Sequence, residues 1–374
     1  MPRYDAIVVG AGPAGSTTAY RLARAGARVY LIDRSRFPRD KPCGGGLTLR
    51  AVRELPFSVD PVVEDRVHTL ELGFRYGPRW SRGADEPLVL MTQRRRLDAF
   101  LVDRAVEAGA EFRDDSKVTA VDPNGVVTLE SERLEAAVVV GADGANGITA
   151  RSLGLPGHEH GVALEGNVGY EHAARDRFGG RAVVELGAVP GGYAWVFPKG
   201  DHVNVGVGGW QKEGPRLRER LRELCSAFDV DEGDVRDLRG HRLPMRGAKR
   251  RPVQGRVLLV GDAAGLVDPL SGDGMYEAFI SSRLAAEATL DLLAGRTDDL
   301  EPYAIRFAEK FEPLEKISWR AKLAFERFPR LAFRLATTSL SWRLFQAVVR
   351  GEQSASDLHG LKGAPLRVLQ ALGA

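Results

Sequence analysis

Cysteine is scarce in this sequence, with only Cys43 and Cys225 among 374 residues. No disulfide framework is therefore expected, and the seven histidines and two cysteines form no spacing typical of a metal site. Apolar runs of about 18 residues are also missing, so no membrane-spanning helix is expected. Residues 1–4 run directly into a strand pattern, which leaves no room for a signal peptide and predicts a cytoplasmic protein.

Charge of either sign is nearly balanced, because 53 lysine and arginine residues stand against 50 aspartate and glutamate residues. The net charge of +3 is too small to indicate nucleic-acid binding, and no nucleic acid is expected as a partner. Glycine, in contrast, is abundant at 43 residues, which cluster in short groups. This clustering is typical of a backbone that approaches a ligand closely at several places.

The N-terminal segment has the pattern of a βαβ unit. Residues 4–9 predict a buried strand, residues 15–25 a helix and residues 28–32 the next strand, which together imply a parallel sheet. Alternating residues from 161 to 209 predict an antiparallel sheet in a second domain. Further elements are expected as helices over 97–108, 216–228 and from 275 to the C-terminus, and as strands over 118–121, 126–129, 137–140 and 256–260.

The segment Val8-Val9-Gly10-Ala11-Gly12-Pro13-Ala14-Gly15 fits a dinucleotide-binding fingerprint. Gly10 allows a tight turn after the strand, Gly12 lets the backbone approach a pyrophosphate, and Gly15 lets the helix pack closely. The free N–H groups of the helix N-terminus favour phosphate. Asp33 ends the second strand, where an acid binds ribose hydroxyls. The cofactor contacts expected from this unit are Gly10, Gly12, Ala14, Gly15, Asp33 and Arg34.

Three later segments resemble motifs of the p-hydroxybenzoate-hydroxylase-like flavoproteins. These segments are Gly261-Asp262-Ala263-Ala264-Gly265 with Asp268-Pro269, Gly141-Ala142-Asp143-Gly144, and Arg94-Arg95-Arg96-Leu97-Asp98. The resemblance implies that the cofactor is FAD, that Asp262 binds its ribityl chain, and that Arg94, Asp143 and Gly261 lie beside it.

A helix is expected to begin near Met275, directly after Gly272 and Gly274. Such a helix N-terminus, aimed at the N1–C2=O edge of the flavin, would stabilise the anion that forms on reduction. Gly272, Gly274 and Met275 are therefore candidate cofactor contacts. The alternative interpretation is a helix cap beside a surface turn.

These patterns predict an α/β fold with a discontinuous, Rossmann-type FAD-binding domain like that of glutathione reductase. The FAD-binding domain is expected to comprise residues 1–60, 92–155 and 250–295. A substrate-binding antiparallel-sheet domain is expected from residues 61–91 and 156–249, and a C-terminal helical region from residues 296–374.

Two segments resemble the geranylgeranyl reductase family more specifically. One is Lys41-Pro42-Cys43-Gly44-Gly45-Gly46, and the other is Tyr193-Ala194-Trp195-Val196-Phe197-Pro198 with Gly206-Val207-Gly208 after a short spacer. The resemblance implies an ene-reductase that acts on a long isoprenoid chain carried by an ether lipid, a quinone or a diphosphate.

Alternation along a strand puts the side chains of Tyr193, Trp195 and Phe197 on one face. Gly206 and Gly208 on the returning strand lack side chains, and an aromatic wall beside them predicts an apolar slot for a hydrocarbon chain. Ordinary core packing beneath the sheet is the alternative.

The glycine-rich loop after the βαβ unit carries Cys43, which is expected near the flavin with Gly44. Reduced flavin delivers a hydride from N5, and a second group must supply a proton to the neighbouring carbon. Cys43 is one candidate for that proton, and Tyr193 or water is another. The alternative for Cys43 is a small buried hydrophobic residue, and Cys225 is expected to be structural.

The C-terminal region between residues 316 and 350 holds eight basic residues and one acidic residue, interleaved with aromatic residues. Such helices can lie on an anionic bilayer, which predicts a peripheral position at the inner face of the membrane, or can pack on the flavin domain. Only one dinucleotide fingerprint is present, so electrons are expected from transiently bound NADPH or from a ferredoxin.

Two other functions compete with the ene-reductase. A flavin monooxygenase or halogenase shares the fold, but Gly265 stands where aromatic hydroxylases of this fold carry histidine, and no Trp-x-Trp-x-Ile-Pro halogenase motif is found. A flavoprotein that only passes electrons to a redox partner is the other alternative.

Overall fold

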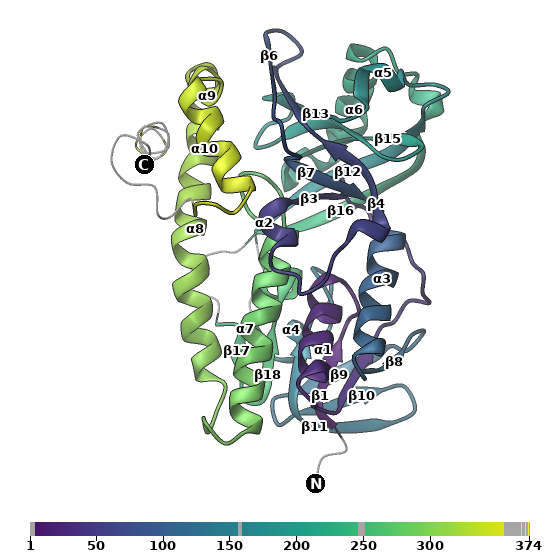
Figure 1. Cartoon of the computed structure of the whole chain (residues 1–374), viewed down its shortest axis with the longest axis vertical. Helices are drawn as coiled ribbons and strands as arrows, with labels where there is room; N and C mark the ends of the chain where they lie inside the picture. The colour runs from purple at the N-terminus through teal and green to yellow at the C-terminus, as the bar shows by residue number, and fades with distance from the viewer. Residues whose placement is uncertain are drawn as a thin grey trace.

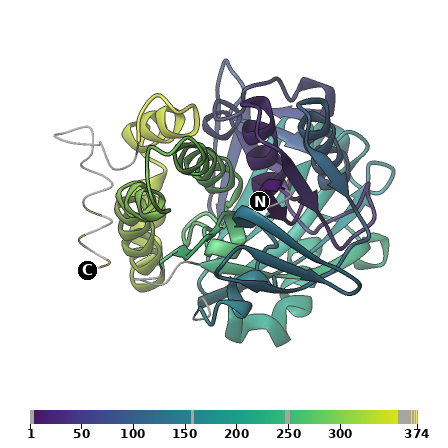
Figure 2. The same ribbon diagram turned by 90° about the horizontal axis from the view of Figure 1, so that it is seen from below.

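The computed structural model describes residues 4–155, 159–245 and 251–354, together with residues 368, 371 and 373. Two large sheets lie one above the other along the longest axis, and the long helix α8 (Glu301–Arg327) runs beside both of them (Figure 1). Seen from below, helices from the C-terminal part of the chain group on one side of the sheets (Figure 2). Among the described residues, no helix combines the length and apolar character needed to cross a membrane.

The lower sheet is built around β1 (Tyr4–Val9), which is parallel to β11 (Arg133–Gly141) on one side and to β2 (Val29–Ile32) on the other. Two more strands pair in parallel, one with β11 and one with β2. The other three pair antiparallel: β17 pairs with β18, and the β9–β10 hairpin pairs with β11. These strands are β8 (Glu111–Arg113), β9 (Val118–Asp122), β10 (Val126–Leu129), β17 (Val253–Gln254) and β18 (Val257–Leu259). The expected βαβ unit and parallel sheet are thus confirmed.

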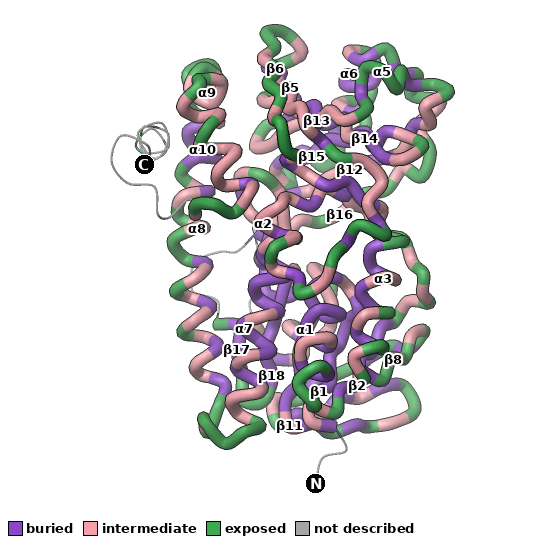
Figure 3. The backbone as a smooth tube through the Cα atoms, viewed as in Figure 1, coloured by how far each residue is buried: buried purple, intermediate pink, exposed green. Residues whose placement is uncertain are grey.

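Three helices pack on the lower sheet and bury its apolar side chains. They are α1 (Pro13–Arg24), α3 (Arg94–Glu107) and α7 (Met275–Leu293). α1 and α7 are mostly buried (Figure 3). α3 begins three residues before the expected start, because buried Arg94 pairs with Asp98 one turn later and stabilises the first turn.

The upper sheet contains seven strands among the described residues, in the order β16-β12-β15-β14-β13-β5-β6. They are β16 (Arg236–Met245), β12 (Glu159–Gly169), β15 (His202–Trp210), β14 (Tyr193–Pro198), β13 (Arg181–Leu186), β5 (Thr69–Phe74) and β6 (Arg79–Gly83). The antiparallel pairing expected over residues 161–209 is confirmed. One pair departs from the antiparallel pattern, because β13 and β5 are parallel. They are far apart in sequence, so a long connection can return the chain in the same direction.

One face of the upper sheet is covered by α6 (Leu217–Ala227), which buries Leu217, Leu221 and Leu224 against it. Cys225 is buried on the same helix. The opposite face of the upper sheet borders the cavity described below. A small sheet of β3 (Gly46–Thr48), β7 (Val89–Thr92) and β4 (Val63–Val67) lies between the two large sheets (Figure 1).

The remaining helices are short or C-terminal. They are α2 (Leu49–Val52), α4 (Thr149–Ser152), α5 (Arg175–Phe178), α9 (Pro329–Ala336) and α10 (Ser339–Val349), with 3-10 turns η1 (Asp60–Val62), η2 (Gln211–Arg216), η3 (Glu232–Asp234) and η4 (Gly261–Ala264). The expected helices from residue 275 onward are confirmed up to Val349. The expectation for residues 355–367 lies outside the described residues.

Candidate functional site

A cavity of about 1570 Å³ runs between the lower sheet, the upper sheet and the C-terminal helices. Most of the site residues expected from the sequence line it, namely Gly10, Gly12, Ala14, Asp33, Arg34, Cys43, Gly44, Arg94, Asp143, Tyr193, Trp195, Phe197, Gly208, Gly261, Asp262, Gly272, Gly274 and Met275. Gly15 and Gly206 do not line it. The topology therefore gathers segments that are up to 265 positions apart, from Gly10 to Met275, around one space.

The three fingerprint glycines meet different surroundings. A Cβ on Gly15 would lie 1.8 Å from the carbonyl oxygen of Gly10, so Gly15 serves the close packing of α1 and not the cavity. Gly10 has φ of +103°, and a Cβ there would lie 2.4 Å from the carbonyl oxygen of Ala142. A Cβ on Gly12 would meet no atom closer than 3.6 Å. Gly12 therefore borders open space at the N-terminus of α1, which no side chain caps.

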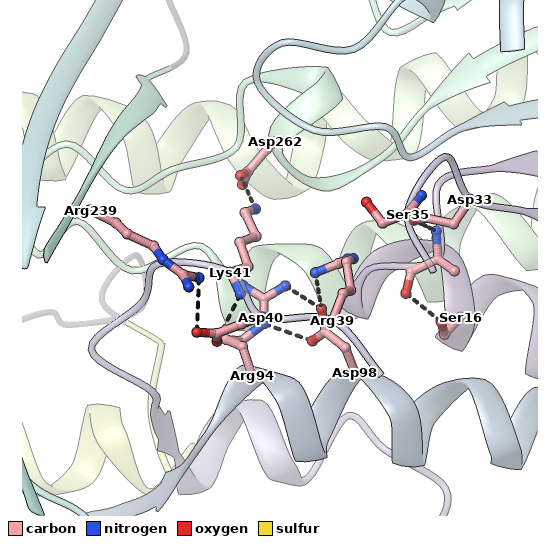
Figure 4. Close-up of polar contacts among 11 residues, drawn as sticks. Ser16, Asp33, Ser35, Arg39, Asp40, Lys41, Arg94, Asp98, Arg239 and Asp262 are labelled. Atoms are coloured by element: carbon pink, nitrogen blue, oxygen red, sulfur yellow. Dashed lines mark hydrogen bonds and ion pairs between the residues drawn. The ribbon is translucent and has the colours of Figure 1, made fainter. Parts of the chain in front are cut away.

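Asp33 is buried at the end of β2 and fixes the loop beside that helix N-terminus. Its Oδ2 accepts a hydrogen bond from the Ala11 N–H at 2.8 Å, and its Oδ1 accepts one from the Ser35 N–H at 2.8 Å (Figure 4). Each carboxylate oxygen keeps further acceptor capacity, so Asp33 can also bind hydroxyl groups in the cavity.

Two arginines face the Gly12 side of the cavity. Arg94 donates two hydrogen bonds to buried Asp98 at 2.7 Å each, and Arg39 pairs with the same carboxylate at 2.8 Å (Figure 4). Burial disfavours the charge of Arg94, but the attraction of Asp98 outweighs it and raises the pKa of the guanidinium. The Nη2 atoms of Arg39 and Arg94 lie 3.6 and 4.0 Å from the Cβ position of Gly12. Two cations and one anion leave one net positive charge there.

Asp262 forms an ion pair with Lys41 at 3.2 Å across the cavity wall (Figure 4). Burial alone would raise the pKa of Asp262, but Lys41 and His241 hold it below its ordinary value, so the side chain stays ionised. Burial, with Lys41 next, lowers the pKa of His241 to about 4, so this imidazole is neutral near pH 7.

These features fit a dinucleotide such as FAD. An uncapped helix N-terminus and a net positive charge border Gly12, and the carboxyl oxygens of Asp33 and Asp262 offer acceptors for sugar hydroxyls. Asp143, also expected near the cofactor, lines the cavity, but its Oδ2 accepts hydrogen bonds from the Thr149 N–H at 2.8 Å and the Thr149 hydroxyl at 3.0 Å. Asp143 therefore holds the start of α4.

The loop of residues 39–45 is tied to the upper sheet. The Asp40 carboxylate pairs with Arg239 of β16 at 2.9 Å, and the Cys43 N–H donates to Oε1 of Glu165 on β12 at 2.6 Å. The ammonium of Lys199, which is 2% exposed, donates to the Gly44 carbonyl at 2.5 Å and to the Thr92 carbonyl at 2.7 Å. Burial lowers the pKa of Lys199 to about 8. These contacts hold Cys43 in the cavity wall.

The aromatic face of β14 is present as expected. Trp195 stacks on Phe197 with 6.1 Å between ring centroids and meets Tyr193 edge-on at 5.8 Å. Its indole Nε1–H donates to Asn204 at 2.8 Å. The expectation that Gly206 lines a slot is wrong, because a Cβ on Gly206 would lie 2.2 Å from Cζ2 of Trp195. The indole itself fills the space above Gly206.

The hydroxyl of Tyr193 donates a hydrogen bond to the carbonyl of Ser271, in the loop before α7. Burial raises the pKa of this phenol. The loop itself is held by Asp268, which accepts hydrogen bonds from the Ser271 N–H at 2.7 Å and from Ser318 of α8. Tyr193 thus anchors a loop, and its proton is committed to that contact.

The C-terminal helices close the far side of the cavity. Trp80 of β6 meets Trp342 of α10 at 5.5 Å, and Phe74 of β5 meets Phe333 of α9 at 5.5 Å. The space between the upper sheet and these helices, here called the apolar compartment, is lined by Leu70, Leu72, Val184, Leu186, Ile317, Phe325, Trp342, Leu344, Phe345 and Val348. These aromatic contacts hold α9 and α10 against the upper sheet.

Sequence reasoning missed Arg39, Lys41, Glu165, Lys199 and His241, all of which lie at or against the cavity wall. The sequence position of Lys199 could have indicated a role at the site, because this residue directly follows the Tyr-x-Trp-x-Phe-Pro segment. Glu165 and His241 had no such indication, because their strands become neighbours only through sheet pairing. No group of metal-binding side chains is found in the described part of the chain.

Three relatives extend these findings. A family model described as FAD binding domain matches residues 3–281. Geranylgeranyl diphosphate reductase of Oryza sativa is 32% identical over 86% of this chain and 77% of its own length. Digeranylgeranylglycerophospholipid reductase 1 of Methanopyrus kandleri is 33% identical (82% and 87% covered), and menaquinone reductase of Mycobacterium tuberculosis is 34% identical (76% of each).

Solved structures share the fold. A geranylgeranyl bacteriochlorophyll reductase-like protein from Thermoplasma acidophilum superposes with a TM-score of 0.82 at 23% identity, covering 99% of both chains. The flavin-dependent brominase Bmp2 superposes with a TM-score of 0.74 at 17% identity, covering 98% and 97% of the two chains. At these identities the likeness is one of architecture, which reductases and halogenases have in common.

Proposed function

Because this chain belongs to the geranylgeranyl reductase family of FAD-dependent oxidoreductases, we propose that it reduces carbon–carbon double bonds in an isoprenoid chain. The three relatives are named for a diphosphate, a glycerophospholipid and a quinone. In the first two names a geranylgeranyl chain is the common feature, so the chain and not the head group defines the proposed substrate class.

The observation that carries this proposal is the apolar compartment, which is continuous with the space beside the fingerprint glycines. Its walls are aromatic and aliphatic side chains from the upper sheet and from α8–α10. A long unsaturated hydrocarbon gains free energy from burial between such walls. A small polar aromatic substrate would leave most of that surface unused.

In this proposal, the N-terminus of α1 and the positive charge of Arg39 and Arg94 hold the pyrophosphate of FAD. Asp33 and Asp262 would accept hydrogen bonds from the ribose and ribityl hydroxyls of that cofactor, and the N-terminus of α7 would stabilise negative charge on its flavin. Bound FAD supplies the hydride equivalent for the reduction. Trp195, Phe197 and Gly208 border the prenyl chain, and Cys43 lies where the chain meets the cofactor.

The electron donor in this scheme is NADPH or a ferredoxin, since the chain has a single dinucleotide fingerprint. Chemical reduction of the enzyme makes the test of function independent of the natural electron donor. We expect the anaerobically reduced protein to convert geranylgeranyl diphosphate, a geranylgeranyl glycerophospholipid or menaquinone into products heavier by steps of about two hydrogen atoms. Mass spectrometry measures the steps and identifies the accepted head group.

A different result would support the shared-fold alternative. No mass gain with any prenyl compound, together with oxygen uptake in the presence of an aromatic substrate, would contradict ene-reduction and favour a monooxygenase. Electron delivery to a protein partner without a new product would favour the electron-transfer alternative.

We also propose that the tip formed by the end of α8 and by α9 contacts an anionic membrane. Arg327, Arg330 and Arg334 are exposed there beside Phe328 and Leu331, whose exposed fractions are 37% and 44% (Figure 3). Glu326 and Pro329 of the same tip line the cavity, so a chain leaving the bilayer would enter at this point. Arginines near an anionic surface each contribute about 1 kcal/mol to binding.

Replacing Arg327, Arg330 and Arg334 by glutamine should therefore weaken binding to anionic vesicles by about 100-fold, as measured by co-sedimentation. The matched control replaces three exposed arginines of η2 and α6, Arg216, Arg218 and Arg222, by glutamine, and should bind like the wild type. Equal loss in both variants would indicate a non-specific charge effect, and no binding by the wild type would contradict the proposal.

A further inference from the structure

Glu165 is a carboxyl group in the wall of the cavity, close to Cys43. It lies on β12 between Arg239 of β16 and Gly206 of β15, is 9% exposed and lines the cavity. Its Oε1 accepts the Cys43 N–H at 2.6 Å. Cys43 and Gly44 line the same cavity, so Glu165 and the loop of residues 39–45 lie side by side in its wall.

Besides the Cys43 thiol, four other titratable groups lie around this point, and each is held in a contact of its own or is neutral at pH 7. Tyr193 donates its hydroxyl proton to the Ser271 carbonyl, and Lys199 donates to two carbonyls without lining the cavity. His241 is neutral at pH 7, as described above. Asp40 is ion-paired with Arg239.

The surroundings of Glu165 favour its protonated form. Burial raises the pKa of this carboxyl, and Asp40 adds to the rise, while the Cys43 N–H, the Lys199 ammonium and Asn204 oppose it only in part. A larger fraction of Glu165 therefore carries a proton near neutral pH than of an ordinary glutamate. The Cys43 N–H and the Lys199 ammonium then stabilise the carboxylate that remains after the proton leaves.

We propose that Glu165 is the proton donor of the double-bond reduction, an inference that rests on the proposed function. The alkene gains a hydride equivalent, which reduced FAD supplies, at one carbon and a proton from the Glu165 carboxyl at the other. The π bond breaks, two C–H bonds form, the flavin is oxidised by two electrons, and the Glu165 carboxylate takes a new proton from solvent.

The test compares Glu165→Gln with Glu185→Gln. The amide of the first variant can still accept the Cys43 N–H but has no acidic proton. Glu185 is another buried carboxyl, on β13, and is paired with Arg79 on the face away from the cavity. In anaerobic single turnovers of the pre-reduced enzymes with a prenyl substrate, we expect Glu165→Gln to be slower by about 100-fold or more and Glu185→Gln to match the wild type.

Four further readouts separate proton donation from a structural role. FAD content and the rate of flavin oxidation by O₂ should be unchanged in Glu165→Gln. The wild-type rate should fall as pH rises through the pKa of Glu165, and this limb should be absent in Glu165→Gln but present in Glu165→Asp. In the protein without FAD or substrate, the infrared difference between wild type and Glu165→Gln should contain a protonated carboxyl band at neutral pH.

A Glu165→Gln rate within about threefold of the wild type would overturn the assignment of Glu165 alone. If Glu165→Gln fails to fold, a wild-type rate that does not fall with rising pH would overturn it as well. A wild-type enzyme that reduces no prenyl substrate would overturn the proposed function and this inference together.

Discussion

Replacing Gly12 by valine is expected to lower the affinity for FAD by about 100-fold while the chain stays folded. A Cβ at this position meets no atom closer than 3.6 Å, so the new side chain starts in open space and not against the backbone. The added methyl groups instead occupy the space between the N-terminus of α1 and the guanidinium groups of Arg39 and Arg94. Losing one or two charge-assisted hydrogen bonds to a phosphate costs about 3 kcal/mol, which corresponds to the expected change.

The measurements are the flavin content of the purified protein, the dissociation constant of FAD from the apoprotein, and thermal unfolding of the apoprotein. Gly214→Ala is the neutral control, because nothing lies within 4 Å of its Cβ position. Gly15→Ala is the opposite control, since its Cβ would lie 1.8 Å from the Gly10 carbonyl oxygen and should prevent folding. A Gly12→Val protein with a full flavin complement would contradict the phosphate site.

The contrast between these glycines shows which parts of the site are predictable from sequence. The spacing of Gly10, Gly12 and Gly15 determines local geometry, because one turn and the first turn of one helix place all three. The same holds for the start of α7 after Gly274 and for the aromatic face of β14. In each case the relevant contacts lie within a few residues, so period and turn chemistry suffice.

Contacts that depend on sheet register were not predictable in this way. Glu165 reaches Cys43 only because β12 pairs with β15 and β16 in one particular register. The parallel pairing of β5 with β13 had no local signal either, and it places Phe74 opposite Phe333. The wall formed by α8–α10 likewise follows from tertiary packing, whereas the charge pattern alone was compatible with a membrane surface or with packing.

Gly206 has a different role from the one that its sequence context predicts. A glycine beside an aromatic strand predicts an open slot, but the indole of Trp195 lies directly over it. The absent side chain therefore determines the position of Trp195 and, through it, the position of the cavity wall. This arrangement predicts a strong energetic coupling between the two positions.

Gly206→Ala alone should lower the free energy of unfolding by about 1–3 kcal/mol, because its Cβ would lie 2.2 Å from the indole and force Trp195 to move. Trp195→Ala alone should cost about 3–5 kcal/mol, since it leaves a cavity and deprives Asn204 of a hydrogen-bond donor. In the double variant the clash is gone, so the total loss should be smaller than the sum by about 1–2 kcal/mol.

Denaturant unfolding of the four proteins measures this coupling, and Gly208→Ala is the comparison on the same strand. Its Cβ would meet atoms no closer than 3.3 Å, so it should lose less stability than Gly206→Ala. Gly206→Ala should also keep FAD yet reduce long prenyl chains more slowly, because the displaced indole intrudes on the compartment that holds them. Strictly additive losses, with unchanged turnover in Gly206→Ala, would mean that Trp195 does not depend on Gly206 and that the aromatic wall is not set by this contact.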